Sequence, residues 1–109
     1  MKEIRKYPEL RLDRHASALV HDEANSRVVF FALAPGQQVP VHTSASTVVV
    51  TVTHGSGTFV GQDSKSSLAI GESAVYQPNE PHGMTAGEQG LRFVAVISPS
   101  PARDSGNGR

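Results

Sequence analysis

The fold of this chain is decided by two segments that each run from a glycine to a histidine, Gly36-Gln37-Gln38-Val39-Pro40-Val41-His42 and Gly71-Glu72-Ser73-Ala74-Val75-Tyr76-Gln77-Pro78-Asn79-Glu80-Pro81-His82. Between them, Thr47-Val48-Val49-Val50-Thr51-Val52-Thr53-His54 alternates with the period of two that is typical of a β-strand. We therefore expect the two histidines to stand on different strands of a small β-barrel.

The rest of the chain also favours short strands. Residues 27–34 are rich in valine and phenylalanine and stop at Pro35-Gly36, and residues 91–97 form a last apolar run. The glycines of Gly55-Ser56-Gly57 predict a hairpin turn into Thr58-Phe59-Val60. Short strands at regular spacing with almost no helical period predict an all-β, double-sheet jelly-roll barrel. We expect an N-terminal segment of strand or coil at 1–17, the barrel at 18–98 and a polar C-terminal tail at 99–109.

Composition narrows the class of protein. The 109 residues are 38% hydrophobic and 18% charged, with ten glycines and seven prolines, and they suit one turn-rich domain. The formal net charge is zero, so we expect neither a nucleic-acid partner nor an anionic membrane partner. The absence of cysteine excludes disulfides and thiolate ligands. No signal-peptide pattern is seen, and the apolar run at 28–34 is too short to span a bilayer, so a cytoplasmic protein is expected.

The two segments resemble the sequence motifs of the cupin superfamily. The first cupin motif places a glycine before His-x-His, a glutamate and a further glycine, and the second places a glycine before Pro-x-Gly and a histidine. Gly36, His42, Gly55, Gly71 and His82 stand at the expected positions. The resemblance covers residues 30–99 and implies a double-stranded β-helix, the cupin form of the jelly-roll barrel.

The resemblance also implies a metal site, which this sequence only half preserves. His42 and His82 match two of the metal-binding histidines of the family, whereas Ser44 replaces the second histidine of the first motif and Val48 replaces its glutamate. A serine hydroxyl is a poor ligand for transition metals, and catalytic zinc usually keeps three protein ligands. At most a weak divalent site for Zn, Ni, Mn or Fe is therefore expected.

Other side chains could complete such a site. Tyr76 stands at a strand position whose side chain faces the barrel interior in the cupin family. Its phenol could contact a ligand or satisfy a buried polar group. Glu80 could supply the missing carboxylate, although a Pro-Asn-Glu-Pro turn is more often plain surface. By strict alternation, His54 would lie on the same face of its strand as Val48. It is near the predicted hairpin, however, and is better explained as a turn residue. His15 and His21 are interpreted as surface histidines.

Two functions of different classes remain open. The first is a binding protein that holds a small molecule in the barrel with His42, Ser44, Val48, Tyr76 and His82, within an apolar lining of valine, phenylalanine and methionine. The second is a metal-dependent enzyme, of the dioxygenase or isomerase type that the resemblance implies, with His42 and His82 as ligands. Whether the protein is an enzyme is left undecided. A homodimer is expected, because pairing would cover the open edges of the sheets.

Overall fold

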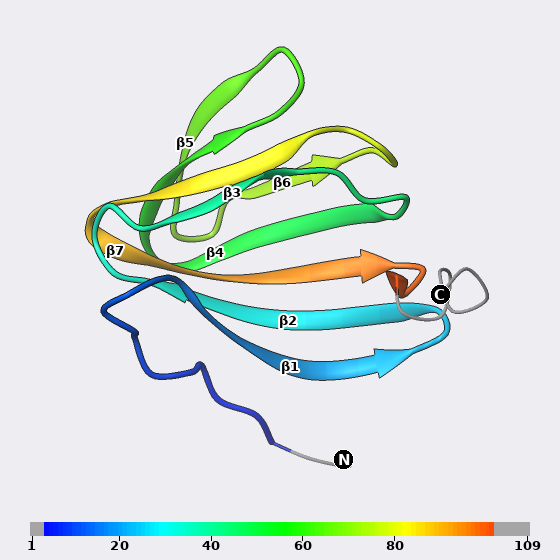
Figure 1. The fold of residues 1–109 in the computed structure, drawn as a ribbon, viewed down its shortest axis with the longest axis horizontal. Helices are drawn as coiled ribbons and strands as arrows, with labels where there is room; N and C mark the ends of the chain where they lie inside the picture. Colours follow the sequence, from blue (N-terminus) through cyan, green and yellow to red (C-terminus); the bar gives the residue numbers. More distant parts are fainter. Residues whose placement is uncertain (1–3, 102–109) are drawn as a thin grey trace.

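The computed structural model of the protein describes residues 4–101 (Figure 1). This part of the chain forms seven strands of one antiparallel sheet. The strands are β1 (Ala16–Glu23), β2 (Ser26–Leu33), β3 (Gln38–His42), β4 (Thr47–Val60), β5 (Lys65–Ala69), β6 (Ser73–Tyr76) and β7 (His82–Ser98). Their order is β1-β2-β7-β4-β5, with β3 paired to β7 and β6 paired to β4.

The two long strands, β4 and β7, close the sheet into a barrel. They pair with each other from Thr47↔Ser98 to Val60↔Gly83. Along its other edge, β7 pairs first with β3 and then with β2, while β4 pairs first with β6 and then with β5. Because each long strand changes neighbours part of the way along, a single sheet curls around its own interior (Figure 1). The predicted all-β jelly-roll architecture is confirmed.

The hairpin predicted at Gly55-Ser56-Gly57 is wrong. β4 runs through these residues without a turn, and its register with β7 shifts between Val52 and His54 and again between Gly55 and Gly57. Gly55 has a φ of 70°, a conformation that serves a bulge as well as a turn. The glycines therefore bend one continuous strand. In the same way, β7 runs as one strand from His82 to Ser98 and includes the predicted strand at 91–97.

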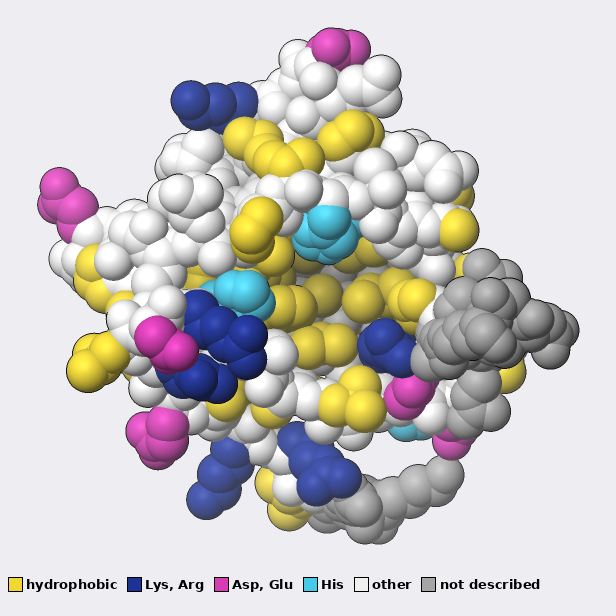
Figure 2. All heavy atoms as spheres, viewed as in Figure 1, with side chains coloured by type: hydrophobic (Ala, Val, Ile, Leu, Met, Phe, Trp, Pro, Cys, Tyr) yellow, Lys and Arg dark blue, Asp and Glu magenta, His cyan; other side chains and the backbone are white. Residues whose placement is uncertain are grey.

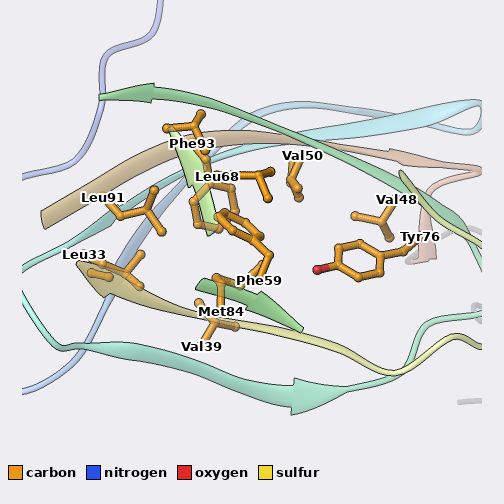
Figure 3. Packing of buried hydrophobic residues seen from close by; sticks show 13 residues of the cluster. Leu33, Val39, Val48, Val50, Phe59, Leu68, Tyr76, Met84, Leu91 and Phe93 are labelled. Atoms are coloured by element: carbon orange, nitrogen blue, oxygen red, sulfur yellow. The ribbon is translucent and has the colours of Figure 1, made fainter. Parts of the chain in front are cut away.

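Inward-facing side chains fill the barrel (Figure 3). On β4 the alternate residues Val48, Val50 and Val52 are only 4%, 1% and 1% exposed, as their period of two predicts. Phe93 packs edge-on against Phe59, with ring centroids 5.6 Å apart. The remaining buried members of this cluster are Leu33, Val39, Leu68, Tyr76, Met84, Ala86, Leu91 and Ala95.

The segments beside the barrel are attached to it. Before β1, the ring of Tyr7 stacks on that of Phe30 at 4.3 Å, and its hydroxyl bonds to the Thr53 hydroxyl at 2.5 Å. After β7, Ser100 is fully buried and donates its hydroxyl to Asp22. Residues 102–109 of the predicted tail lie outside the described residues.

No helix within residues 4–101 is long and apolar enough to cross a membrane.

Candidate functional site

A pocket of about 340 Å³ opens at one face of the barrel. Figure 2 shows this hollow, with hydrophobic side chains on its floor and histidine side chains near its margin. Its lining residues are Phe31, Val39, His42, Thr43, Ser44, Ala45, Ser46, Val48, Val50, His82, Met84, Phe93, Ala95, Ile97 and Pro101. The volume lies at the lower end of the range of small-molecule sites.

His42 and His82 meet in this pocket. They stand directly opposite each other in the β3–β7 pairing, and their ring centroids are 4.2 Å apart. His82 is 5% exposed and His42 is exposed, so one imidazole lies inside the wall of the pocket and the other at its rim. The prediction that the two rings approach each other on adjacent strands is confirmed.

Both imidazoles are oriented by the same local hydrogen bond. The Nδ1–H group of His42 donates to the Pro40 carbonyl at 2.8 Å, and that of His82 donates to the Glu80 carbonyl at 2.9 Å. A carbonyl oxygen can only accept, so Nδ1 carries the proton in both neutral rings. Each Nε2 is then an acceptor that can bind a ligand hydroxyl or a metal ion.

The environment of His82 favours its neutral form. Burial lowers the pKa of His82 below its usual value of 6.5, and the neighbouring His42 lowers it further, against the opposing effect of the hydrogen bond to Glu80. The folded protein therefore binds a proton at His82 less readily than the unfolded chain. It follows that the free energy of unfolding falls as the pH drops below about 6.5, because the unfolded state gains protons first.

We expect two measurements to report this difference. In NMR titration, the ring protons of His82 should show a midpoint below 6.5. In urea unfolding between about pH 7.5 and about pH 5.5, the wild type should lose more stability than His82→Gln, which has no imidazole to protonate at this position. A midpoint at or above the usual value would contradict the prediction, as would equal losses in the two proteins.

Ser44 and Val48 both line the pocket, as predicted for the positions of the missing ligands. The Ser44 carbonyl accepts a hydrogen bond from the Asn79 amide at 2.6 Å, and its hydroxyl oxygen accepts one from the Ser46 amide at 3.1 Å. Val48 is 4% exposed, between Tyr76 on β6 and Ile97 on β7. Among the described residues, no group of three or more histidine, aspartate or glutamate side chains could hold a metal ion. The donor set of a three-ligand or four-ligand cupin metal centre is therefore not formed by this part of the chain.

Tyr76 and Glu80 take up structural positions beside His82. The Tyr76 ring lies 4.9 Å from that of His82, but it does not line the pocket, and its hydroxyl points into the barrel interior (Figure 3). Burial, together with the charge of Glu80, raises the pKa of Tyr76 to about 12, so the phenol stays protonated at neutral pH. The Glu80 carboxylate accepts hydrogen bonds from the backbone amides of Gln77 at 3.0 Å and Gln62 at 3.4 Å, which holds its turn together.

The bulges of β4 explain His54. Simple alternation would turn His54 inward with Val48, but the register shift after Val52 reverses this, and His54 is exposed. Its ring lies edge-on to Tyr7 with centroids 5.5 Å apart, and its Nδ1 lies 2.9 Å from the Thr53 hydroxyl. It is a strand residue on the outer surface rather than the turn residue that was predicted.

Several lining residues were not predicted. Phe31 on β2 stacks on Phe93 at 4.8 Å, and Ile97 on β7 lies farther along the same wall. Thr43 and Ser46 line the pocket because they belong to the short segment between His42 and β4. Val52 and Phe59 pack in the core and do not reach the pocket. His15 also differs from a plain surface residue, since it donates to the Gln38 carbonyl at 3.2 Å and packs against Phe31.

Comparison with solved structures identifies the class of protein. An RmlC-like cupin protein from Desulfovibrio desulfuricans is 30% identical, with 91% of this chain and 97% of that chain covered and a TM-score of 0.78. The chain therefore belongs to the cupin superfamily.

Two further structures share the fold. A conserved protein with a double-stranded β-helix domain from Klebsiella pneumoniae is 23% identical, covers 94% of both chains and has a TM-score of 0.85. A protein from Thermus thermophilus is 22% identical, covers 93% of this chain and 98% of its own, and has a TM-score of 0.84. No family model matches the sequence, and no curated protein matches it either.

Proposed function

We propose that this cupin binds a small, mainly apolar molecule that carries one hydrogen-bonding group. The observation that carries this proposal is the separation of polar and apolar groups in the pocket. In the part of the chain that the structure describes, every polar lining residue belongs either to the segment 42–46 or to His82, the strand partner of His42. The remaining lining residues are apolar.

The lining also indicates the charge of the ligand. Within the described residues 4–101, the lining contains no aspartate, glutamate, lysine or arginine, and burial favours the neutral form of His82. A permanently charged ligand would therefore lose its hydration without gaining an opposite charge. A ring or short chain with a single hydroxyl or weakly acidic group suits the pocket better, because its polar end can donate to a free imidazole Nε2 while its body contacts Phe31, Met84 and Phe93.

A weak divalent-metal site is the second candidate. The hydrogen bonds that fix Nδ1 of both histidines leave both Nε2 atoms as acceptors, on rings whose centroids are 4.2 Å apart. Metal-bound imidazoles usually make such a hydrogen bond through their other ring nitrogen. With two protein ligands, any bound Zn, Ni, Mn or Fe would depend on water or on the ligand to complete its coordination shell, and we expect a chelator to remove it easily. We favour binding over metal-dependent catalysis for this reason.

Phenol and toluene test the proposed binding function. We expect both to shift the NMR signals of residues lining the pocket. The variant His42→Ala should weaken phenol binding about 3- to 10-fold, which corresponds to the net value of one hydrogen bond, and should change toluene binding much less. His54→Ala, outside the pocket, serves as the matched control and should bind both compounds like the wild type. Equal losses for phenol and toluene in His42→Ala, or no binding of either compound, would contradict the proposal.

A further inference from the structure

A short segment after β7 forms part of the pocket wall. β7 ends at Ser98, and the prolines Pro99 and Pro101 that follow have no backbone N–H group with which to continue a strand pairing. Pro101 is half-buried and, like Ile97 of β7, lines the pocket. We call residues 99–101 the latch.

Hydrogen bonds from two parts of the barrel hold the latch in place. Ser46, which is buried and also lines the pocket, donates its hydroxyl to the Pro99 carbonyl at 2.6 Å. The Ser100 amide donates to the Ala24 carbonyl at 3.2 Å, in the turn between β1 and β2. The Ser100 hydroxyl donates to Asp22 on β1. Ser100 is fully buried, so these bonds are what makes its burial favourable.

The carboxylate that receives the Ser100 hydroxyl is itself fixed on the pocket side of the sheet. Asp22 pairs with Arg27 on β2, and Arg27 pairs with Ile97. Arg27 lies four residues before Phe31, so both side chains face the same side of β2. The guanidinium donates to the second carboxylate oxygen at 3.2 Å, and the two side chains are only 27% and 22% exposed. Such charge-assisted bonds are strong where water is partly excluded.

We propose that the latch closes one end of the pocket, so that Pro101 limits the length of the molecule that the pocket accepts. The limit on length rests on the proposed binding function, whereas the closure does not. Replacing Pro101 by alanine removes two carbon atoms from the wall. A ligand that is longer by one or two methylene groups should then bury them in the vacated space, and each buried methylene strengthens binding about 4-fold.

Amide hydrogen exchange measured by NMR tests the closure without a ligand. Ser100→Ala keeps the amide of residue 100 but removes the hydroxyl bond to Asp22, so protection of this amide should fall at least about 10-fold. Ser73→Ala is the matched control, because it removes an exposed serine hydroxyl that bonds to Thr51 and should leave the latch unchanged. Equal protection of residue 100 in the wild type and both variants would overturn the proposal. An equal fall at Val50 in the core would also overturn it, because the whole barrel would then be opening.

Binding of phenol and of 3- and 4-propylphenol, measured by NMR titration, tests the limit on length. In Pro101→Ala, the affinity for at least one propylphenol relative to phenol should rise about 4- to 15-fold, the value of one or two buried methylene groups. Pro35→Ala, at an exposed proline outside the pocket, should keep the wild-type ratios. Unchanged ratios in Pro101→Ala, or an equal rise in the control, would show that Pro101 does not limit length. If the wild type binds none of the three compounds, the proposed function and the limit on length both fail, and exchange at residue 100 still decides whether the latch closes the pocket.

Discussion

The double variant Ser44→His with Val48→Glu is expected to convert the pocket into a tight divalent-metal site. With Zn²⁺ or Ni²⁺ at about 100 times its dissociation constant, metal binding should stabilise the folded state by about 2.7 kcal/mol. For a domain of this size, that corresponds to a rise in melting temperature of roughly 10–20 °C. The wild type, with its two imidazoles, should show a much smaller rise.

The same variant should be less stable than the wild type without metal. Val48 is almost fully buried, so a glutamate at this position would place a carboxyl where a valine now packs. Replacing Ser44 also removes the hydroxyl oxygen that accepts the Ser46 amide. We expect a cost of about 1–3 kcal/mol, which bound metal would offset by binding only the folded state.

The matched control for this prediction is Ser44→His with Val48→Gln. This control preserves the size of the new side chains but removes the carboxylate that compensates the charge of the cation. Metal should therefore raise its melting temperature less. Thermal unfolding of the three proteins with and without metal makes the comparison. If metal raises the melting temperature of the glutamate variant no more than that of the wild type, Ser44 and Val48 do not occupy the positions of the cupin metal ligands.

Gly55→Ala is expected to destabilise the barrel by at least about 2 kcal/mol. A Cβ at this position would lie 2.1 Å from the Gly90 carbonyl oxygen, and the φ of Gly55 is 70°. The left-handed conformation alone costs an alanine about 1–2 kcal/mol, and relieving a backbone overlap adds a similar or larger amount. Since both contacting groups are backbone, neither strand can yield without disturbing the β4–β7 pairing.

Gly71→Ala separates the two contributions. Gly71 also has a positive φ, 87°, but a Cβ there would meet nothing within 4 Å. The Gly71→Ala variant should therefore lose only the stability that the left-handed conformation costs an alanine, about 1–2 kcal/mol. Urea unfolding of both variants measures the difference. If Gly55→Ala loses no more stability than Gly71→Ala, the close approach at Gly90 does not constrain the barrel.

The sequence predicted the barrel and the pair of histidines because both depend on spacing. The spacing from glycine to histidine and the alternation of Val48, Val50 and Val52 can be recognised in the sequence whatever conformation the loops adopt. The direction of His54 could not be predicted, because a bulge reverses parity and a glycine with positive φ serves a bulge or a turn equally well. The contribution of Phe31 to the pocket depends on β2 pairing with the second half of β7, a long-range register that no local pattern encodes.

The exchange of neighbours along β4 and β7 also bears on how the chain reaches its native state. The β1–β2 hairpin joins residues close in sequence, such as Glu23 and Ser26, and its formation closes only a short loop. The β4–β7 pairing instead joins Val60 to Gly83 at its nearest point and Thr47 to Ser98 at its farthest, with β5 and β6 between them. Loop-closure entropy is lost before such distant contacts form, so topologies of this kind fold in milliseconds to seconds rather than microseconds. The connectivity that encloses the pocket therefore also makes folding slow.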